Sequence, residues 1–456
     1  MAKRSRAPSD SRGANKAKRA GVATKPTPSA LAILSSWPAK RARGARRRRR
    51  YVPRWADLTC GPAGVIAEHA LANDMSDHLS FRAVCREWRR GAVDAAPRPR
   101  GCLDRRFHPR RWIMLREAAP PGPGRHRRRF LNVSTGECVQ TELPELDGHR
   151  LLGATTEGLL VLLDKSTFVV RVLNPITWQL AELPSLDPLL PPKTRGKISE
   201  YGLTYGFKVT GVGLAGDSTV ALCVYDPMML VVAKPGDDGW TPVEVKGGDG
   251  RWLFSAISFH GRFYCVNSEA VMVLEAATAD KPPRLVVASK LAFGVSGIGR
   301  DTVHLVESDG RLLLLHRKFT SREEYNPQKK LSTEWWIRKY KVNVVDLAKK
   351  RTVAAADLGG RAVFLGKTRA LSVSPLVFPS IRANMVYPAA DIWERREQGV
   401  SSYCLLSGAV GRCKVRLSRR MSYHDEEFDG GWERPCGIGD YLSWYVSGRS
   451  YAIEEI

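Results

Sequence analysis

The sequence lacks the features that would indicate a membrane protein or a disulfide-stabilised secreted protein. No uninterrupted apolar run among its 456 residues is long enough to span a bilayer. The longest candidate, residues 158–173, is interrupted by Asp164, Lys165 and Arg171. The nine cysteines are an odd number and include no Cys-x-x-Cys pair. We therefore expect free thiols in a reducing compartment and no membrane contact.

Motifs for catalysis are also missing. The sequence contains no Gly-x-Ser-x-Gly elbow, no phosphate-binding loop and no His-Glu-x-x-His zinc motif. Residues 211–216 match a dinucleotide-binding fingerprint as letters, but the residues after them are typical of a strand and not of a helix. His304 and His316 flank an apolar, strand-rich run, where packing is the expected role. We expect no enzyme activity, no cofactor and no metal site.

Acidic residues are nearly absent from residues 1–54, which hold 17 Lys and Arg beside the single acid Asp10. This segment carries most of the net charge of +26 and few aromatic residues, so we expect a disordered basic arm. Its clusters resemble nuclear-import signals or weak nucleic-acid contacts, and an organelle transit peptide or a tail without an address are alternatives. The expected location is the nucleus, the cytoplasm or both. The main cluster is Arg46, Arg47, Arg48, Arg49 and Arg50.

Residues 55–94 have the periodicity of short helices. One set of apolar residues follows the spacing i, i+3, i+4 and i+7, which predicts a single stripe on one helix. An earlier segment, Pro62 to Leu71, presents Val65 and Ile66 on a narrow apolar face. A helical unit of about 40 residues is too small to be stable without a partner or a neighbouring domain. The stripe consists of Phe81, Val84, Cys85 and Trp88.

These segments resemble the F-box of plant proteins, the helical module that docks a substrate receptor onto the Skp1-type adaptor of a cullin ubiquitin ligase. The resemblance lies in residues 55–58, which read Trp-Ala-Asp-Leu, and in residues 81–88. The middle departs from the family pattern at Leu58-Thr59 and Ala63-Gly64, so a degenerate F-box or a helical cap without an adaptor is an alternative. The resemblance implies that the adaptor binds Leu58, Val65, Ile66 and Leu71. It implies a module core of Trp55, Phe81, Val84, Cys85 and Trp88.

From about residue 110 the pattern changes to short apolar runs separated by Gly, Pro, Asn and Asp. A glycine followed by an apolar strand recurs at Gly158, Gly261 and Gly310. A four-stranded unit that repeats every 40 to 50 residues is typical of β-propeller blades, because stacked blades bury each other's faces. We predict a mainly β, kelch-like propeller of six blades, or of seven if residues 436–456 complete the first blade. An irregular pair of β-sandwiches is the alternative.

Four strings resemble the KIB-type β-propeller domain that follows F-boxes in a large cereal family: residues 101–112, 363–366, 370–374 and 384–387. This resemblance spans roughly residues 55–456. It implies a receptor subunit of an SCF (Skp1-cullin-F-box) ubiquitin ligase, with the adaptor and cullin complex on the F-box and an unknown target protein on the propeller. The expected domains are a basic arm (1–54), an F-box-like module (55–94), an Arg-rich hinge (95–111) and a propeller (112–456).

Two features are candidates for target contact. Trp335 and Trp336 follow residues 318–333, which are predicted to be a polar insertion between strands. Residues 98–129 contain eleven arginines beside Asp104 and Glu117, a bias that favours an acidic partner or a phosphate backbone. The alternative function is therefore a nuclear, nucleic-acid-associated protein, or a general protein-interaction propeller whose degenerate F-box binds no adaptor.

Overall fold

The computed structural model describes residues 60–93, 104–115, 126–201, 207–216, 218–225, 228–245, 253–278, 281–295, 301–326, 331–389, 391–412 and 437–447. All of them belong to the second of the two units into which the chain divides, Met1–Arg54 and Trp55–Ile456. The predicted basic arm with Arg46 to Arg50, and the F-box residues Trp55 and Leu58, therefore lie outside the described residues. No helix in the described ranges is both long and apolar enough to cross a membrane.

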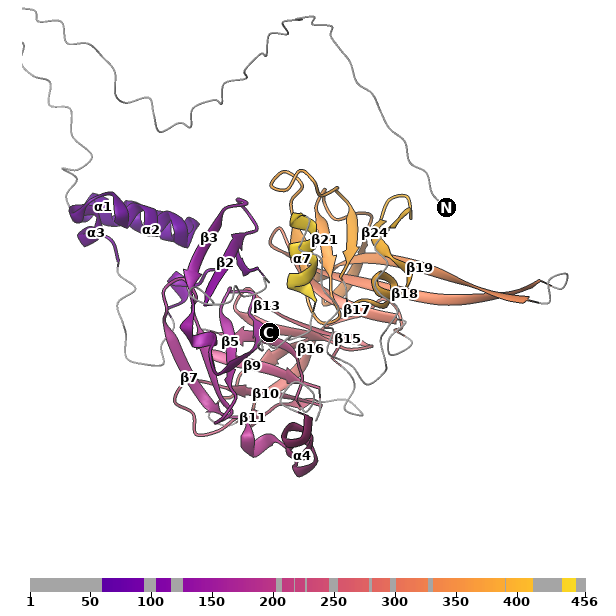
Figure 1. The fold of residues 1–456 in the computed structure, drawn as a ribbon, viewed down its shortest axis with the longest axis horizontal. Helices are drawn as coiled ribbons and strands as arrows, with labels where there is room; N and C mark the ends of the chain where they lie inside the picture. Colours follow the sequence, from indigo (N-terminus) through magenta and orange to yellow (C-terminus); the bar gives the residue numbers. More distant parts are fainter. Residues whose placement is uncertain are drawn as a thin grey trace, which may run out of the picture. The chain divides into compact units, whose positions relative to one another are not determined.

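Three short helices open the described part of the chain (Figure 1): α1 (Cys60–Asn73), α2 (Met75–Val84) and α3 (Arg86–Gly91). Asp74 separates α1 from α2 with an extended backbone, and its Oδ1 accepts the backbone N–H of Ser76 at 2.9 Å as an N-cap. Cys85 separates α2 from α3 in the same way, and its Sγ accepts the backbone N–H of Trp88 at 3.4 Å. The prediction of one continuous helix from Phe81 to Trp88 is therefore wrong, because Cys85 ends α2 and caps α3.

The rest of the described chain is mainly β and propeller-like, with antiparallel strands in consecutive groups. The first group contains β1 (Trp112–Met114), β2 (Arg127–Asn132) and β3 (Cys138–Glu142). The second contains β4 (His149–Ala154), β5 (Leu160–Asp164), β6 (Val169–Leu173) and β7 (Leu180–Ser185). The third contains β8 (Val209–Ala215), β9 (Thr219–Val224), β10 (Met229–Ala233) and β11 (Thr241–Pro242).

The fourth and fifth groups form one nine-stranded sheet, in which the parallel pair of Lys290 with Arg351 links two four-stranded halves. The fourth contains β13 (Ser255–Phe259), β14 (Arg262–Val266), β15 (Ala270–Glu275) and β16 (Arg284–Lys290), with β12 (Glu244–Val245) paired to β16. The fifth contains β17 (Asp301–Ser308), β18 (Arg311–Asn326), β19 (Leu331–Asp346) and β20 (Arg351–Ala355). The sixth contains β21 (Ala362–Leu365), β22 (Ala370–Val373), β23 (Met385–Pro388), β24 (Val400–Cys404) and β25 (Val410–Arg412).

The second to fifth groups confirm the predicted four-stranded repeat. In each, the strands pair in chain order, and the first strands β4, β8, β13 and β17 lie next to one another. The repeated glycines Gly158, Gly261 and Gly310 occupy the turn after the first strand, at φ +82°, +74° and +69°. The sixth group departs from this order, because β22 precedes β21 in the sheet and β21 runs parallel to β23.

Buried apolar side chains fill the space between each group and the next. Among the described residues, one cluster joins the first and second groups, and four more join the successive groups up to the sixth. A further cluster joins the sixth group back to the first, with Ile113 and Leu131 packed near Phe364. Each sheet is thus covered on both faces by its neighbours, as the predicted propeller requires.

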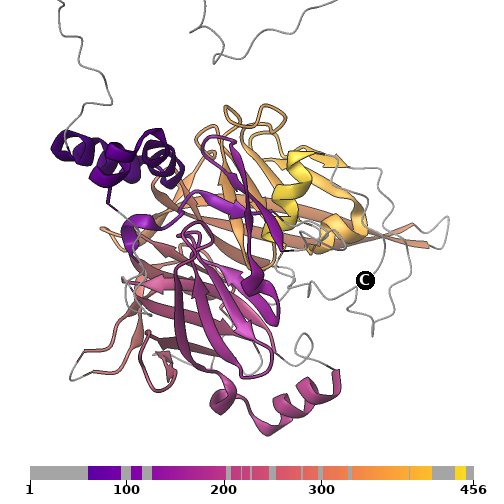
Figure 2. The same cartoon turned by 60° about the vertical axis from the view of Figure 1, so that its left-hand side comes forward.

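A helix, not a strand, lies at the junction of the sixth and first groups. Leu442 and Val446 of α7 (Ile438–Val446) are fully buried in the cluster that joins these groups, and Figure 2 shows the yellow helix between purple and orange strands. The backbone of α7 approaches so closely that a Cβ atom at Gly366 would lie 1.8 Å from the carbonyl oxygen of Val446. The prediction that residues 436–456 complete the first blade as a strand is therefore wrong for the described residues 437–447.

The connections hold short helices and one long hairpin. Residues 318–333, predicted to be a polar insertion, are mostly strand, because β18 and β19 extend far beyond their neighbours as a two-stranded ribbon (Figures 1 and 2). The short helices are η2 (Arg105–Phe107), η3 (Pro144–Leu146), η4 (Asp187–Leu189), α4 (Pro192–Tyr201) and α6 (Trp393–Gln398).

Candidate functional site

The helical module, defined here as α1 to α3, has a small core. Ala63, Ala67 and Phe81 are buried together, and Trp88 packs against them half-buried. The rings of Phe81 and Trp88 stack with their centroids 4.5 Å apart. Val84 was predicted to belong to this core, but its side chain is 60% exposed, so that prediction is wrong. Alanine side chains bury little apolar area, so this core alone contributes little to the stability of the module.

Four large apolar side chains of the helical module are exposed instead. We call them the apolar helix surface: Val65 (56% exposed) and Ile66 (38%) on α1, and Leu79 (44%) and Val84 (60%) on α2. Full burial of such a side chain contributes about 1.5 to 3 kcal/mol. Val65 and Ile66 are neighbours on α1, which contacts α2, and exposed apolar side chains of this kind gain free energy when a partner covers them. Val65 and Ile66 are among the predicted adaptor-binding residues, and Leu79 was missed because it lies off the predicted stripe.

Asp74 joins the helical module to the first strand group. Its Oδ1 accepts the Nε1–H of Trp112 at 3.0 Å, and its Oδ2 accepts an Nδ2–H of Asn132 at 2.9 Å. Trp112 and Asn132 are both buried. The six strand groups together are called the β-domain here. The Asp74 carboxylate therefore caps α2 and accepts hydrogen bonds from two buried donors of the β-domain. An aspartate before a helix indicates only an N-cap from the sequence alone, because the two partners of Asp74 lie 38 and 58 residues away along the chain.

Asn132 and Asn174 repeat one arrangement 42 residues apart. Each side-chain oxygen closes the turn after its strand, accepting the backbone N–H of Ser134 at 2.9 Å and of Ile176 at 3.1 Å. Each Nδ2 then donates to the segment before the first strand group. Asn132 donates to Oδ2 of Asp74, and Asn174 donates to the carbonyl oxygen of Phe107 at 2.8 Å. The repeated asparagines thus fasten the helical module and η2 to the β-domain.

An apolar contact accompanies these hydrogen bonds. Leu71 and Met75 are buried against Phe107, with Ile176 packed beside them. The Leu71 side chain is only 8% exposed. Leu71 therefore offers little surface for the predicted contact with an adaptor, because its side chain is buried against other residues of its own chain.

Residues 104–111, the described part of the predicted Arg-rich hinge, also pack on the β-domain. Gly158 leaves room for them, since a Cβ atom there would lie 2.1 Å from the carbonyl oxygen of Pro109. Burial raises the pKa of Glu157, and the positive charge of Arg110 opposes that shift. Burial also raises the pKa of Glu307, and the positive charge of Arg110 opposes this shift as well. Charge on this segment therefore faces acidic groups of the second and fifth strand groups.

Buried ionisable groups lie around the base of the β18–β19 ribbon. Arg317 donates from Nε to Oε1 of Glu394 at 2.8 Å, and its Nη2 contacts the second carboxylate oxygen. His316 contacts Asp301 in a second buried pair. Burial lowers the pKa of His304 to about 3. Within the described ranges, no group of three His, Cys, Asp or Glu side chains is placed to hold a metal ion.

Trp335 and Trp336 lie in β19, where their backbones pair with Arg322 and Ser321 of β18. Their role in target contact stays a prediction.

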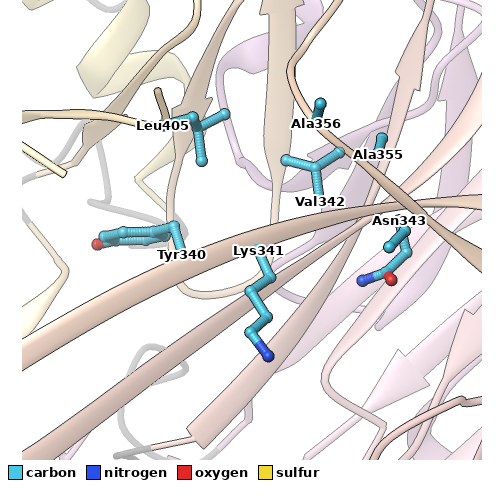
Figure 3. A pocket seen from close by; sticks show the side chains of 8 residues that line it. Tyr340, Lys341, Val342, Asn343, Ala355, Ala356 and Leu405 are labelled. Carbon is cyan, nitrogen blue, oxygen red and sulfur yellow. The ribbon is translucent and has the colours of Figure 1, made fainter. Parts of the chain in front are cut away.

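A pocket of about 280 Å³ lies at the base of the ribbon (Figure 3). It is lined by residues 340–343 of β19, by residues 354–356 at the end of β20, and by Leu405, which follows β24. Tyr340 and Asn343 are each 5% exposed, whereas Lys341 is exposed.

A family model for the KIB1-4 beta-propeller matches residues 130–404, more than half of the chain. The chain belongs to the KIB1-4 beta-propeller family. The KIB match begins within β2 and ends at the last residue of β24, so it includes most of the lining of the pocket. The helical module, β1 and α7 lie outside it.

No curated protein matches this chain. Among solved structures, Hsv2 of Kluyveromyces lactis is similar at 14% identity and a TM-score of 0.24, covering 54% of this chain and 74% of that chain. Virginiamycin B lyase of Staphylococcus aureus is similar at 10% identity and a TM-score of 0.25, covering 52% of this chain and 85% of that chain. Neither likeness bears on function.

Proposed function

We propose that this chain is the substrate-receptor subunit of an SCF ubiquitin ligase, in which the helical module is an F-box and the KIB propeller binds the target protein. The apolar helix surface carries the proposal. Its four exposed side chains belong to a module whose own core consists mainly of alanines and two aromatic rings. Such a module gains free energy when a partner covers these side chains. The resemblance of residues 55–58 and 81–88 to plant F-boxes favours a Skp1-type adaptor as that partner.

The six strand groups correspond in this proposal to six blades, with α7 at the junction of the last blade and the first. The Asp74 hydrogen bonds and the burial of Leu71 against Phe107 support a fixed attachment of F-box to propeller. A target on the propeller then has a defined position relative to the adaptor, which favours ubiquitin transfer by proximity. In this role the chain supplies binding surfaces, and other subunits of the ligase carry out the chemistry.

Co-purification with a Skp1-type adaptor tests the proposal. The double variant Val65→Asp/Ile66→Asp places two charges on the apolar helix surface at positions that are already exposed. Leu376→Asp is the matched control, since Leu376 is 94% exposed and lies between β22 and β23, far along the chain from the helical module. We expect the wild type and the control to retain the adaptor, and the double variant to lose it while its melting temperature stays unchanged. Failure of the folded wild type to retain any Skp1-type adaptor, or equal retention by the double variant, contradicts the proposal.

A further inference from the structure

Next to the pocket, one edge of β19 lacks a strand partner among the described residues. β20 pairs with β19 as far as Val342, which lies opposite Ala355. β19 continues beyond this point toward Leu331, and there it pairs with β18 alone. Among the described residues, the edge of β19 at positions 339–341 therefore has no strand partner on the side of β20. An open strand edge of this kind is a template for the backbone of another chain.

The pocket lies at the step where β20 ends. In Figure 3 the side chains of Tyr340 and Leu405 lie on one side of it, and Ala355 and Asn343 lie on the other. Asn343 is 5% exposed, and its Nδ2 has no hydrogen-bond acceptor among the described residues. A buried amide donor without an acceptor is destabilising, and a carbonyl group of a bound peptide would satisfy it. This unsatisfied donor points to a ligand that the chain itself does not supply among its described residues.

The charge around this edge is basic. Lys318 and Lys339 lie directly opposite each other on β18 and β19, and both are exposed. Two like charges at opposite positions of an antiparallel pair destabilise it. Lys341, two residues farther along β19, lines the pocket and is exposed as well. Two acidic neighbours, Asp301 and Glu394, are buried, and they already contact His316 and Arg317. Negative charge on a ligand would therefore relieve a repulsion that is built into the ribbon.

We propose that an extended acidic segment of the target protein binds here as an added strand. Its backbone pairs with residues 339–341 of β19, one of its side chains enters the pocket, and its carboxylates lie near Lys318, Lys339 and Lys341. The inference rests on the proposed function, because it assigns the target-binding surface of the receptor. It also defines the class of target segment, a β-forming sequence with several Asp or Glu residues.

Fluorescence anisotropy with labelled peptides tests the inference on the full chain without an adaptor. The probes are a panel of peptides of about eight residues in which Glu or Asp alternates with Val or Thr, since this pattern favours strands. One control set carries Lys in place of the acids, and a second carries Pro at alternate positions, which blocks backbone pairing. The protein variants are Lys318→Glu/Lys339→Glu and Lys341→Glu. Lys349→Glu is the matched control, because Lys349 is an exposed lysine in the turn between β19 and β20.

We expect the acidic peptides to bind the wild type and Lys349→Glu equally, and to bind the other two variants at least about tenfold more weakly. We expect the peptides that carry Lys in place of the acids, or Pro at alternate positions, to show no binding. The inference is overturned if no acidic peptide binds the wild type, if the Pro peptides bind as well as their parents, or if charge reversal at Lys318 and Lys339 has no effect. Adaptor retention by Lys318→Glu/Lys339→Glu should equal that of the wild type, so failure of this inference is distinguishable from failure of the receptor proposal.

Discussion

Replacement of Asp74 by alanine should loosen the helical module from the propeller. The change removes the N-cap of α2, which contributes about 1 kcal/mol. It also removes the acceptor for the Nε1–H of Trp112 and for an Nδ2–H of Asn132, which are buried donors that each cost about 1 to 3 kcal/mol when left without an acceptor. We therefore expect the free energy that holds the module in place to fall by about 3 to 6 kcal/mol, allowing for non-additivity between neighbours.

Hydrogen exchange of the backbone amides measures this loss. A fall of about 3 kcal/mol corresponds to roughly a hundredfold faster exchange of amides that open with the module, so α1 and α2 should exchange faster while β4 to β7 do not change. Asp74→Asn should lose less, because asparagine is a good N-cap and keeps one acceptor oxygen. Asp77→Ala is the control, since Asp77 is exposed in the first turn of the same helix. Exchange in Asp74→Ala that matches this control refutes the role assigned to the carboxylate.

Three further changes should have measurable effects on the propeller. Glu394→Ala removes the carboxylate that Arg317 contacts with two nitrogens, and denaturant unfolding should register a loss of about 3 to 5 kcal/mol. Gly158→Ala should lower the melting temperature, because a Cβ atom there meets a carbonyl oxygen at 2.1 Å. His304 has its folded pKa lowered to about 3, so between that pH and its ordinary value near 6.5 the unfolded state binds the extra proton and stability falls as the pH falls. His304→Gln should flatten that pH dependence in a series of unfolding curves; an unchanged slope would show that other groups cause it.

The strand repeat was predictable because its signals are local. Gly158, Gly261 and Gly310 need positive φ at tight turns, and a glycine followed by an apolar strand is visible in the sequence alone. The pairing of β21 with β23 has no such signal, because a parallel neighbour is set by tertiary packing. The order of strands in the sixth group therefore could not be predicted from the same pattern.

The helical module was predicted in outline but not in its packing. Large apolar residues dominate a periodicity argument, so Val65 and Ile66 defined the expected face, whereas the buried face is formed by Ala63, Ala67 and Leu71. Tertiary contact with Phe107 buries Leu71, and no local signal indicates such a contact.

Two further differences from the predictions have local causes in the sequence. The break at Cys85 depends on its thiol as a cap for α3, a role that Ser or Asp fills more often. Leu442 and Val446 have the four-residue spacing of a helix, and this spacing favours α7 over the predicted closing strand.

The most direct test of the receptor account is a hydrogen-exchange footprint of the full chain with and without a Skp1-type adaptor. The account predicts slower exchange over residues 60–84 of α1 and α2 when the adaptor is bound, and no change in β17 to β20. It also predicts that Val65→Asp/Ile66→Asp shows no protection in either region. Protection that falls on the propeller and leaves α1 and α2 unchanged, or no protection of the wild type at a saturating adaptor concentration, contradicts the account.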